Sequence, residues 1–212
     1  MRRHKLVLRQ KTNIAQKLPS DLNDKVLSFQ KFVIKQRKRH GNSLSLIGNM
    51  DETPMFFDLV GNRTVEHRGN KSVLVKTTGH EKQHFTVVLA CMADGSKLPP
   101  MVIFKRKTFP KKEKFPPGVV VHVQPRGRMD EDGCKKWIER VWNGRPGGLL
   151  RKRSLIVWDM FRSHLVESVK QKLKSGNTDI AVIPGGLTSV LQPLDVSINK
   201  PFKDAMRSLW NE

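Results

Sequence analysis

Two short apolar segments with a helical segment between them constrain the fold more than any other part of this sequence. Ser154–Trp158 (SLIVW) and Ile180–Ile183 (IAVI) are apolar along almost their whole length. Strands of this kind are typical of the centre of a sheet that is covered on both faces. Between them, Ser163–Lys174 has apolar residues four apart and Gly176 follows it, which predicts a helix that ends there. The pattern therefore predicts consecutive strand–helix units around a buried sheet.

The segments upstream of this region predict further strands. Leu44–Met50 and Val119–Val123 are short apolar runs bounded by turn residues. Phe85–Met92 and Leu98–Phe104 flank the turn Ala93–Lys97 (ADGSK), whose Asp-Gly pair indicates a hairpin. Helices are predicted for Met129–Trp142 and for the C-terminal segment with Phe202, Met206 and Trp210 on one face. A hairpin followed by strand–helix units predicts an α/β fold, with a mixed sheet flanked by helices.

The charge of the chain indicates which partners it binds. Lys and Arg number 40 against 19 Asp and Glu, so the formal net charge is +21. A folded domain with this excess predicts a nucleic-acid partner, and an anionic membrane surface is the alternative. No apolar run approaches the roughly 20 residues that cross a bilayer, which predicts an intracellular protein without a membrane span. The two cysteines, Cys91 and Cys134, lack the spacing of zinc ligands.

Much of the positive charge lies in the first 40 residues, which hold twelve Lys and Arg and two Asp. Here Ser20 is the predicted cap of a helix that ends at Gly41. Its expected apolar face consists of Leu22, Val26, Phe29 and Val33. Met1–Leu18 is predicted to be a second basic helical piece, which indicates that the chain begins inside a longer protein.

Two basic clusters are candidate contacts for DNA phosphates. Lys35–His40 (KQRKRH) fits a nuclear localisation signal or a DNA-binding surface. Lys105–Lys114 (KRKTFPKKEK) fits a phosphate-contacting loop or a solvated loop without a ligand. The candidate DNA-binding residues are Arg2, Arg3, Lys5, Arg37, Lys38, Arg39, Lys105, Arg106, Lys107, Lys111 and Lys112.

Three aspartates occupy positions where a metal site is expected. Asp51 follows the first apolar strand, Asp159 follows SLIVW, and Asp195 lies in LTSVLQPLD before the last helix. Ligands bind at the carboxyl ends of strands in open α/β sheets, although a strand-end Asp also serves as a turn or helix cap. Carboxylates without a His or Cys cluster suit Mg²⁺ or Mn²⁺, and two such ions about 3.5–4 Å apart stabilise an in-line displacement at phosphorus.

The motifs NMDETP, DxxxxH (Asp159 and His164) and LQPLD followed by KPF occur in this order. Together they resemble the DDE-superfamily endonuclease domain of pogo and Tigger transposases and of their transposon-derived relatives, including jerky-like and centromere-protein-B-like proteins. The resemblance implies an RNase H-like mixed sheet of about five strands over residues 44–212. It also implies that residues 1–18 are the end of a helix-turn-helix DNA-binding domain and that 19–43 are a basic helical linker.

The resemblance further implies that Asp51, Asp159 and Asp195 are catalytic and bind two Mg²⁺ or Mn²⁺ ions. The implied ancestral activity is metal-dependent cleavage and strand transfer on DNA. A catalytically silent, domesticated DNA-binding or chromatin-associated protein on the same fold is the alternative. In both cases the expected location is the nucleus, with DNA as partner, and the family implies a homodimer. Glu52 is expected to be structural, and for His164 contact with a phosphate, orientation of Asp159, capping and packing all remain open.

Overall fold

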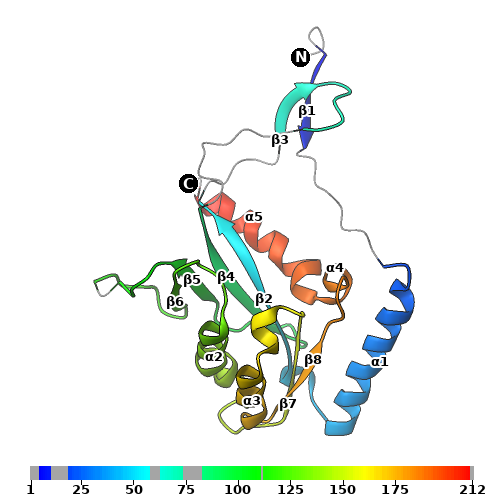
Figure 1. The fold of residues 1–212 in the computed structure, drawn as a ribbon, viewed down its shortest axis with the longest axis vertical. Helices are drawn as coiled ribbons and strands as arrows, with labels where there is room; N and C mark the ends of the chain where they lie inside the picture. Colours follow the sequence, from blue (N-terminus) through cyan, green and yellow to red (C-terminus); the bar gives the residue numbers. More distant parts are fainter. Residues whose placement is uncertain (1–4, 11–18, 58–62, 74–82, 111, 211–212) are drawn as a thin grey trace. The chain divides into compact units, whose positions relative to one another are not determined.

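The computed structural model describes residues 5–10, 19–57, 63–73, 83–110 and 112–210. The chain divides into two compact units, one made of Met1–Lys17 with Phe56–His84 and the other of Leu18–Met55 with Phe85–Glu212. Figure 1 shows the elements of both units as a ribbon. The strands are β1 Leu6–Gln10, β2 Ile47–Phe56, β3 Arg63–His67, β4 His84–Met92, β5 Met101–Lys105, β6 Val120–Gln124, β7 Ser154–Trp158 and β8 Thr178–Val182. The α-helices are α1 Leu22–His40, α2 Glu131–Arg140, α3 Glu167–Ser175, α4 Thr188–Leu191 and α5 Asn199–Trp210.

The smaller unit contains a two-stranded antiparallel sheet. Strand β1 pairs with β3 from Leu6 opposite His67 to Gln10 opposite Arg63. The helix predicted for Met1–Leu18 is therefore wrong over β1. The partner strand lies more than fifty residues further along the chain, so local helical spacing could not reveal this pairing. The assignment of residues 1–18 to a helix-turn-helix domain stays a prediction, and most of these residues lie outside the described ranges.

Helix α1 is the basic helical segment expected before the larger domain. Phe29 is buried, and Leu22, Val26 and Val33 pack around it, so the predicted apolar face is confirmed. Gly41 ends the helix with a φ of 61°, and its N–H donates to the carbonyl of Arg37. The N-cap is Asp21, not the predicted Ser20. Gly tolerates this left-handed conformation because it has no Cβ.

A six-stranded mixed sheet forms the centre of the larger unit, with the order β6-β5-β4-β2-β7-β8. Strands β2, β7 and β8 run parallel, β4 and β5 are antiparallel, and β5 and β6 are parallel. The predicted hairpin across the Asp-Gly turn is confirmed, although its second strand begins at Met101 and not at Leu98. The α/β class and the mixed sheet are confirmed, with six strands where about five were expected.

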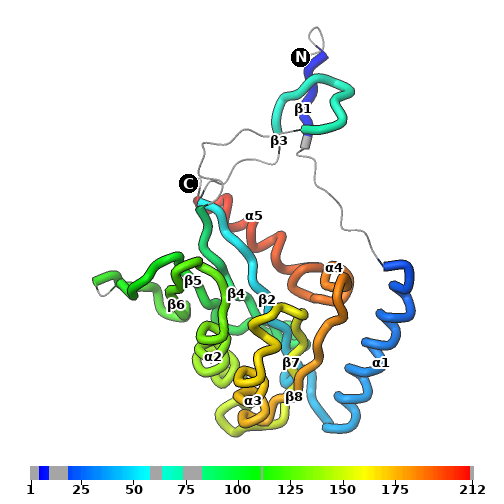
Figure 2. The backbone as a smooth tube through the Cα atoms, in the orientation of Figure 1, coloured from blue at the N-terminus to red at the C-terminus, as the bar shows by residue number. Residues whose placement is uncertain are grey.

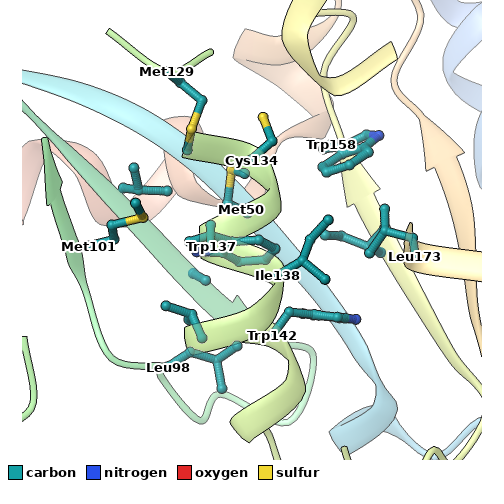
Figure 3. Close-up of a cluster of buried hydrophobic side chains, with 14 of the residues drawn as sticks. Met50, Leu98, Met101, Met129, Cys134, Trp137, Ile138, Trp142, Trp158 and Leu173 are labelled. Atoms are coloured by element: carbon teal, nitrogen blue, oxygen red, sulfur yellow. The ribbon is translucent and has the colours of Figure 1, made fainter. Parts of the chain in front are cut away.

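Strand β7 is apolar along its length because both of its faces are covered. Ile156 and Trp158 belong to the core under α2 and α3, whereas Leu155 and Val157 belong to the core under α1 and the segment after β8. Figure 3 shows part of the first core, where Trp158 lies beside residues of α2 and α3. The central position predicted from SLIVW is confirmed, and the carboxyl end of β7 is thereby held rigidly.

A close packing contact explains one glycine in β2. A Cβ added to Gly48 would lie 2.6 Å from Cζ3 of Trp142 and 3.0 Å from Sδ of Met92. The indole of Trp142 is itself buried and donates a hydrogen bond to Thr178, so it has little room to move.

We expect Gly48→Ala to lower the free energy of unfolding by about 1–3 kcal/mol, as overpacked cores do. Urea unfolding followed by tryptophan fluorescence measures this change. Gly144→Ala is the control, because a Cβ there meets no atom within 4 Å.

None of the helices in the described ranges has the length and apolar character needed to cross a membrane.

The last helix, α5, begins two residues before Pro201, so this proline lies in its first turn. A π-helical turn, Leu194–Ile198, leads directly into α5. Figure 2 traces this path from β8 through α4 into α5. The third predicted acid, Asp195, lies in the π-helical turn.

Candidate active site

Asp51 and Asp195 meet at the side chain of Asn199. Asp51 lies on the central strand β2 and is only 7% exposed. The Asn199 Nδ2 group donates to Asp51 Oδ2 at 2.7 Å and to Asp195 Oδ1 at 3.1 Å. Asp195 and Asn199 are four residues apart on consecutive helical turns, so their side chains share a face. The structure therefore brings together the first and third predicted acids.

The electrostatics of this pair favour an added positive charge. Burial and the nearby negative charges of Asp195 and Glu52 raise the pKa of Asp51 to about 7, against the lowering effect of the Asn199 hydrogen bond. At neutral pH Asp51 therefore ionises only against a substantial free-energy cost. A proton or a cation bound between the two carboxylates would remove that cost.

The donor atoms at this pair fit a hard divalent cation. The Oδ1 atom of Asn199 is buried and has no hydrogen-bond partner within the described ranges. Two carboxylates and one amide oxygen are the type of ligand that Mg²⁺ and Mn²⁺ prefer. Lys203, one turn along α5, is the nearby cation: burial lowers its pKa, while Asp195 and Asp51 oppose this effect.

Asn49 fixes the part of strand β2 that carries Asp51. Its Nδ2 donates to the carbonyl of Val157 in β7 at 2.7 Å. Its Oδ1 accepts a hydrogen bond from the backbone N–H of Leu194 at 3.4 Å. One buried side chain thus joins β2, β7 and the π-helical turn that holds Asp195. This residue and Asn199 were missed from the sequence, although the NMDETP motif and the spacing of Asn199 from Asp195 are visible there.

Asp159 lies just beyond the end of β7. Continuing the β2–β7 register from Asn49 opposite Val157 places Asp159 level with Asp51 on the neighbouring strand. Its Oδ1 accepts hydrogen bonds from His164 Nδ1 at 2.9 Å and from the backbone N–H of Phe161 at 3.0 Å. Burial alone would raise the pKa of Asp159, but these hydrogen bonds outweigh it and lower the pKa below its ordinary value. Asp159 is therefore ionised at neutral pH.

His164 links Asp159 to Glu52. The ring is fully buried, and its Nε2 donates to Glu52 Oε1 at 2.9 Å. Burial alone would lower the pKa of His164, but its two carboxylate partners raise it to about 9. Both ring nitrogens donate to carboxylates, so His164 is an imidazolium at neutral pH. Of the roles left open for this residue, the structure favours orientation of Asp159.

The three predicted acids do not form one closed cluster in this arrangement. Across the described ranges, no three His, Cys, Asp or Glu side chains lie close enough together to hold a metal ion. Asp51 and Asp195 are paired, while one oxygen of Asp159 is engaged by His164. Asp51 thus lies on β2, Asp159 just after the neighbouring strand β7, and Asp195 in the π-helical turn before α5.

The predicted DNA-contacting residues lie in separate places. Arg37, Lys38 and Arg39 are exposed in the last turn of α1. Lys105, Arg106, Lys107 and Lys112 are exposed in or beside the loop between β5 and β6, where Arg106 pairs with Glu113 at 2.9 Å. Figure 1 shows α1 and this loop on opposite sides of the six-stranded sheet. Lys5 lies in the smaller unit, whereas Arg2, Arg3 and Lys111 lie outside the described residues.

Comparison with known sequences gives consistent matches. The family model described as DDE superfamily endonuclease matches residues 82–212. The Homo sapiens protein named pogo transposable element with KRAB domain is 42% identical over 211 residues, which are all of this chain and 34% of that protein. The Homo sapiens protein named pogo transposable element with ZNF domain is 31% identical over 212 residues, or 15% of its own length. The chain thus spans about a third or less of these relatives.

Comparison with solved structures identifies the fold. The Mos1 transposase paired-end complex with left transposon end matches with a TM-score of 0.58 at 12% identity, covering 92% of this chain and 53% of that one. The Mos1 transposase catalytic domain with raltegravir and Mg matches with a TM-score of 0.54 at 14% identity, covering 90% and 75%. The RNase H-like fold that the resemblance implied is confirmed.

Proposed function

Since the chain belongs to the DDE superfamily endonuclease family, we propose that it cleaves phosphodiester bonds of DNA with the help of divalent metal ions. Asp51, Asp159 and Asp195 are the proposed catalytic metal ligands. The observation that carries the proposal is the pairing of the buried Asp51 with the exposed Asp195 through the buried side chain of Asn199. A buried carboxylate beside a second carboxylate that solvent can reach suits a cation, which would offset both the burial of Asp51 and the repulsion between the two charges.

The residues of this chain have distinct roles in the proposed chemistry. Asp51 and Asp195 would hold one cation, and the ionised Asp159 would supply a ligand from the end of the neighbouring strand β7. Two Mg²⁺ or Mn²⁺ ions would supply an activated water or 3′-hydroxyl and stabilise the leaving oxygen. Asn49 keeps the strand ends and the π-helical turn in register. Solved structures of the same fold contain Mg, which agrees with this choice of metal.

DNA is the proposed substrate because of the charge of the chain. A net charge of +21 attracts a polyanion, and the carboxylates form a local negative site within that positive surface. The matched Mos1 complex contains a transposon end, which supports DNA as the partner. The exposed cations of α1 and of the β5–β6 loop are the proposed phosphate contacts. The same exposed run at the end of α1 is proposed as a nuclear localisation signal, and homodimerisation stays a prediction.

A plasmid assay tests the proposal. Incubation of supercoiled plasmid with the chain and Mg²⁺ or Mn²⁺ is expected to produce nicked circles, and excess EDTA is expected to prevent this. Agarose gel electrophoresis measures the nicked fraction over time. Replacement of Mg²⁺ by Ca²⁺ is the control for metal-induced folding or aggregation. Ca²⁺ also binds carboxylate oxygens but accepts a less strict coordination geometry than Mg²⁺. A chain that binds DNA and leaves the plasmid supercoiled under all these conditions contradicts the enzymatic proposal.

That second outcome would favour the alternative function, a silent DNA-binding protein. The observation in its favour is that the three acids do not converge within the described ranges. Under this alternative the basic surfaces bind DNA, and chromatin proteins are additional partners. The plasmid assay separates the two functions, because both require DNA binding, which gel-shift titration measures, and only one requires nicking.

A further inference from the structure

Asp159 is held by a set of contacts that leaves one of its two carboxylate oxygens available. Its Oδ1 accepts both the Phe161 N–H and the His164 Nδ1–H. Its Oδ2 has no hydrogen-bond partner in the part of the chain that the structure describes. Two donors on a single oxygen fix the rotation of the carboxylate about its Cβ–Cγ bond. The hydrogen bonds to Oδ1 thus determine the direction in which Oδ2 points.

His164 can fix this rotation because its own ring is immobilised. The ring stacks on Trp158 with centroids 4.6 Å apart and an interplanar angle of 9°. The ring of Phe161 meets it edge-on, with centroids 5.4 Å apart. On the far side, Glu52 accepts from Nε2 at 2.9 Å. The side chain therefore cannot turn without losing a buried hydrogen bond and an aromatic contact.

The position of Glu52 connects this assembly to the first acid. Glu52 directly follows Asp51 on β2, and successive strand residues face opposite sides of the sheet. Asp51 accordingly contacts Asn199, whereas Glu52 contacts His164. Strand β2 thus carries the proposed ligand Asp51 and, through Glu52, also anchors His164, which holds the proposed ligand Asp159.

We propose that His164, anchored by Glu52 and stacked on Trp158, is a positioning residue that orients Asp159 so that Oδ2 is the oxygen presented to a divalent cation. This inference rests on the proposed function, because it assigns a task within the same metal site. Residues that hydrogen-bond to metal ligands typically change metal affinity about 10–100-fold when removed. His164 forms such a hydrogen bond to the proposed ligand Asp159.

Two substitutions at His164 separate positioning from packing. In His164→Asn the amide nitrogen takes the place of Nδ1 and keeps the donor to Asp159, but contact with Glu52 is lost. In His164→Gln the amide nitrogen reaches the place of Nε2 and keeps contact with Glu52, but the donor to Asp159 is lost. Both variants lose the stacked ring, so we expect similar decreases in melting temperature. A purely structural role would make the two variants equivalent.

Mn²⁺ affinity is the readout, because it does not depend on turnover. Electron paramagnetic resonance of free Mn²⁺ titrated into the metal-free chain gives the dissociation constant. We expect His164→Gln to weaken Mn²⁺ binding about tenfold and His164→Asn to weaken it less than about threefold. Equal affinities in the two variants, or weaker binding by His164→Asn, overturn the inference. A parent chain that binds no Mn²⁺ overturns the proposed metal site itself, and the inference with it.

A second pair of variants covers the case in which His164 variants fail to fold. Glu52 is partly exposed, so its replacement is better tolerated than that of His164. Glu52→Ala removes the anchor of Nε2, whereas Glu52→Gln keeps an acceptor there and removes the same negative charge. We expect Glu52→Ala to weaken Mn²⁺ binding to an extent similar to His164→Asn, which loses the same Glu52 contact, and Glu52→Gln to restore most of the affinity. If both weaken it equally, the charge of Glu52 matters and its anchoring role is contradicted.

Discussion

Asp51→Asn is expected to lower the rate of Mg²⁺- or Mn²⁺-dependent plasmid nicking at least about 100-fold. The amide is neutral, so it cannot replace the carboxylate charge that a hard cation requires. The measurement is the initial rate of nicked-circle formation at saturating plasmid. We expect a loss of similar size for Asp195→Asn, because the two carboxylates share Asn199.

The same substitution is expected to stabilise the metal-free protein. The pKa of Asp51 is raised in the folded state to about 7 from an ordinary value of 3.8, so the folded chain retains a proton that the unfolded chain has lost. The stability of the parent therefore falls as pH rises from about 4 through 7. Asp51→Asn does not titrate and escapes this loss, which we expect to be worth of the order of 2 kcal/mol at pH 8.

Urea unfolding at pH 5 and pH 8, in EDTA, measures this effect. The gap between Asp51→Asn and the parent should widen at the higher pH, and Mg²⁺ should stabilise only the parent. Asp132→Asn is the control, because Asp132 is exposed on α2 and lies outside the site. Full nicking activity in Asp51→Asn would show that Asp51 is not a metal ligand.

The second large effect concerns the loop between β5 and β6. We expect the triple variant Lys105→Ala, Lys107→Ala, Lys112→Ala to lower DNA affinity about 100-fold at 0.1 M salt, since each neutralised phosphate contributes through counterion release. The slope of the logarithm of the binding constant against the logarithm of the salt concentration should become shallower by about 3. Fluorescence anisotropy with a labelled duplex at several salt concentrations gives both quantities.

A charge-matched variant tests whether the place of these cations matters. Arg140, Lys152 and Lys174 are exposed cations outside the loop, and replacing all three with Ala removes the same charge. If phosphates contact the loop, this control should change the affinity only a few-fold. Equal losses in the two triple variants would indicate that net charge alone governs binding and that the loop is solvated.

The elements that the sequence predicted correctly are those whose pattern is visible within a few neighbouring residues. The apolar run of β7 indicated a strand covered on both faces, and the two cores confirm it. Asp51 and Asp159 were found because each follows an apolar run, although Asp51 lies inside β2 and only Asp159 follows its strand. The Asp-Gly turn predicted the β4–β5 hairpin, because its conformation is decided within a few residues.

The parts that could not be predicted depend on contacts between distant residues. Strand β1 exists through its pairing with β3, and no local period in Leu6–Gln10 reveals that partner. The hydrogen bond between His164 and Glu52 joins residues 112 positions apart. Glu52 was considered structural because it faces away from Asp51. Glu52 does contact residues other than those that Asp51 contacts, and its hydrogen bond to His164 could not be seen in the sequence.

The alternation along β2 has a genetic consequence. Because Asp51 and Glu52 are consecutive and serve opposite faces, inserting or deleting one codon in the turn before β2 would exchange their sides if the strand kept its pairing. After a deletion, Glu52 would lie opposite Asn199 and Thr53 opposite His164, whereas after an insertion Met50 and Asp51 would lie there. Such a change leaves the composition almost unaltered and retains every acidic side chain, yet it would assign each to the wrong task. Length changes before this strand should therefore be rarer than substitutions within it.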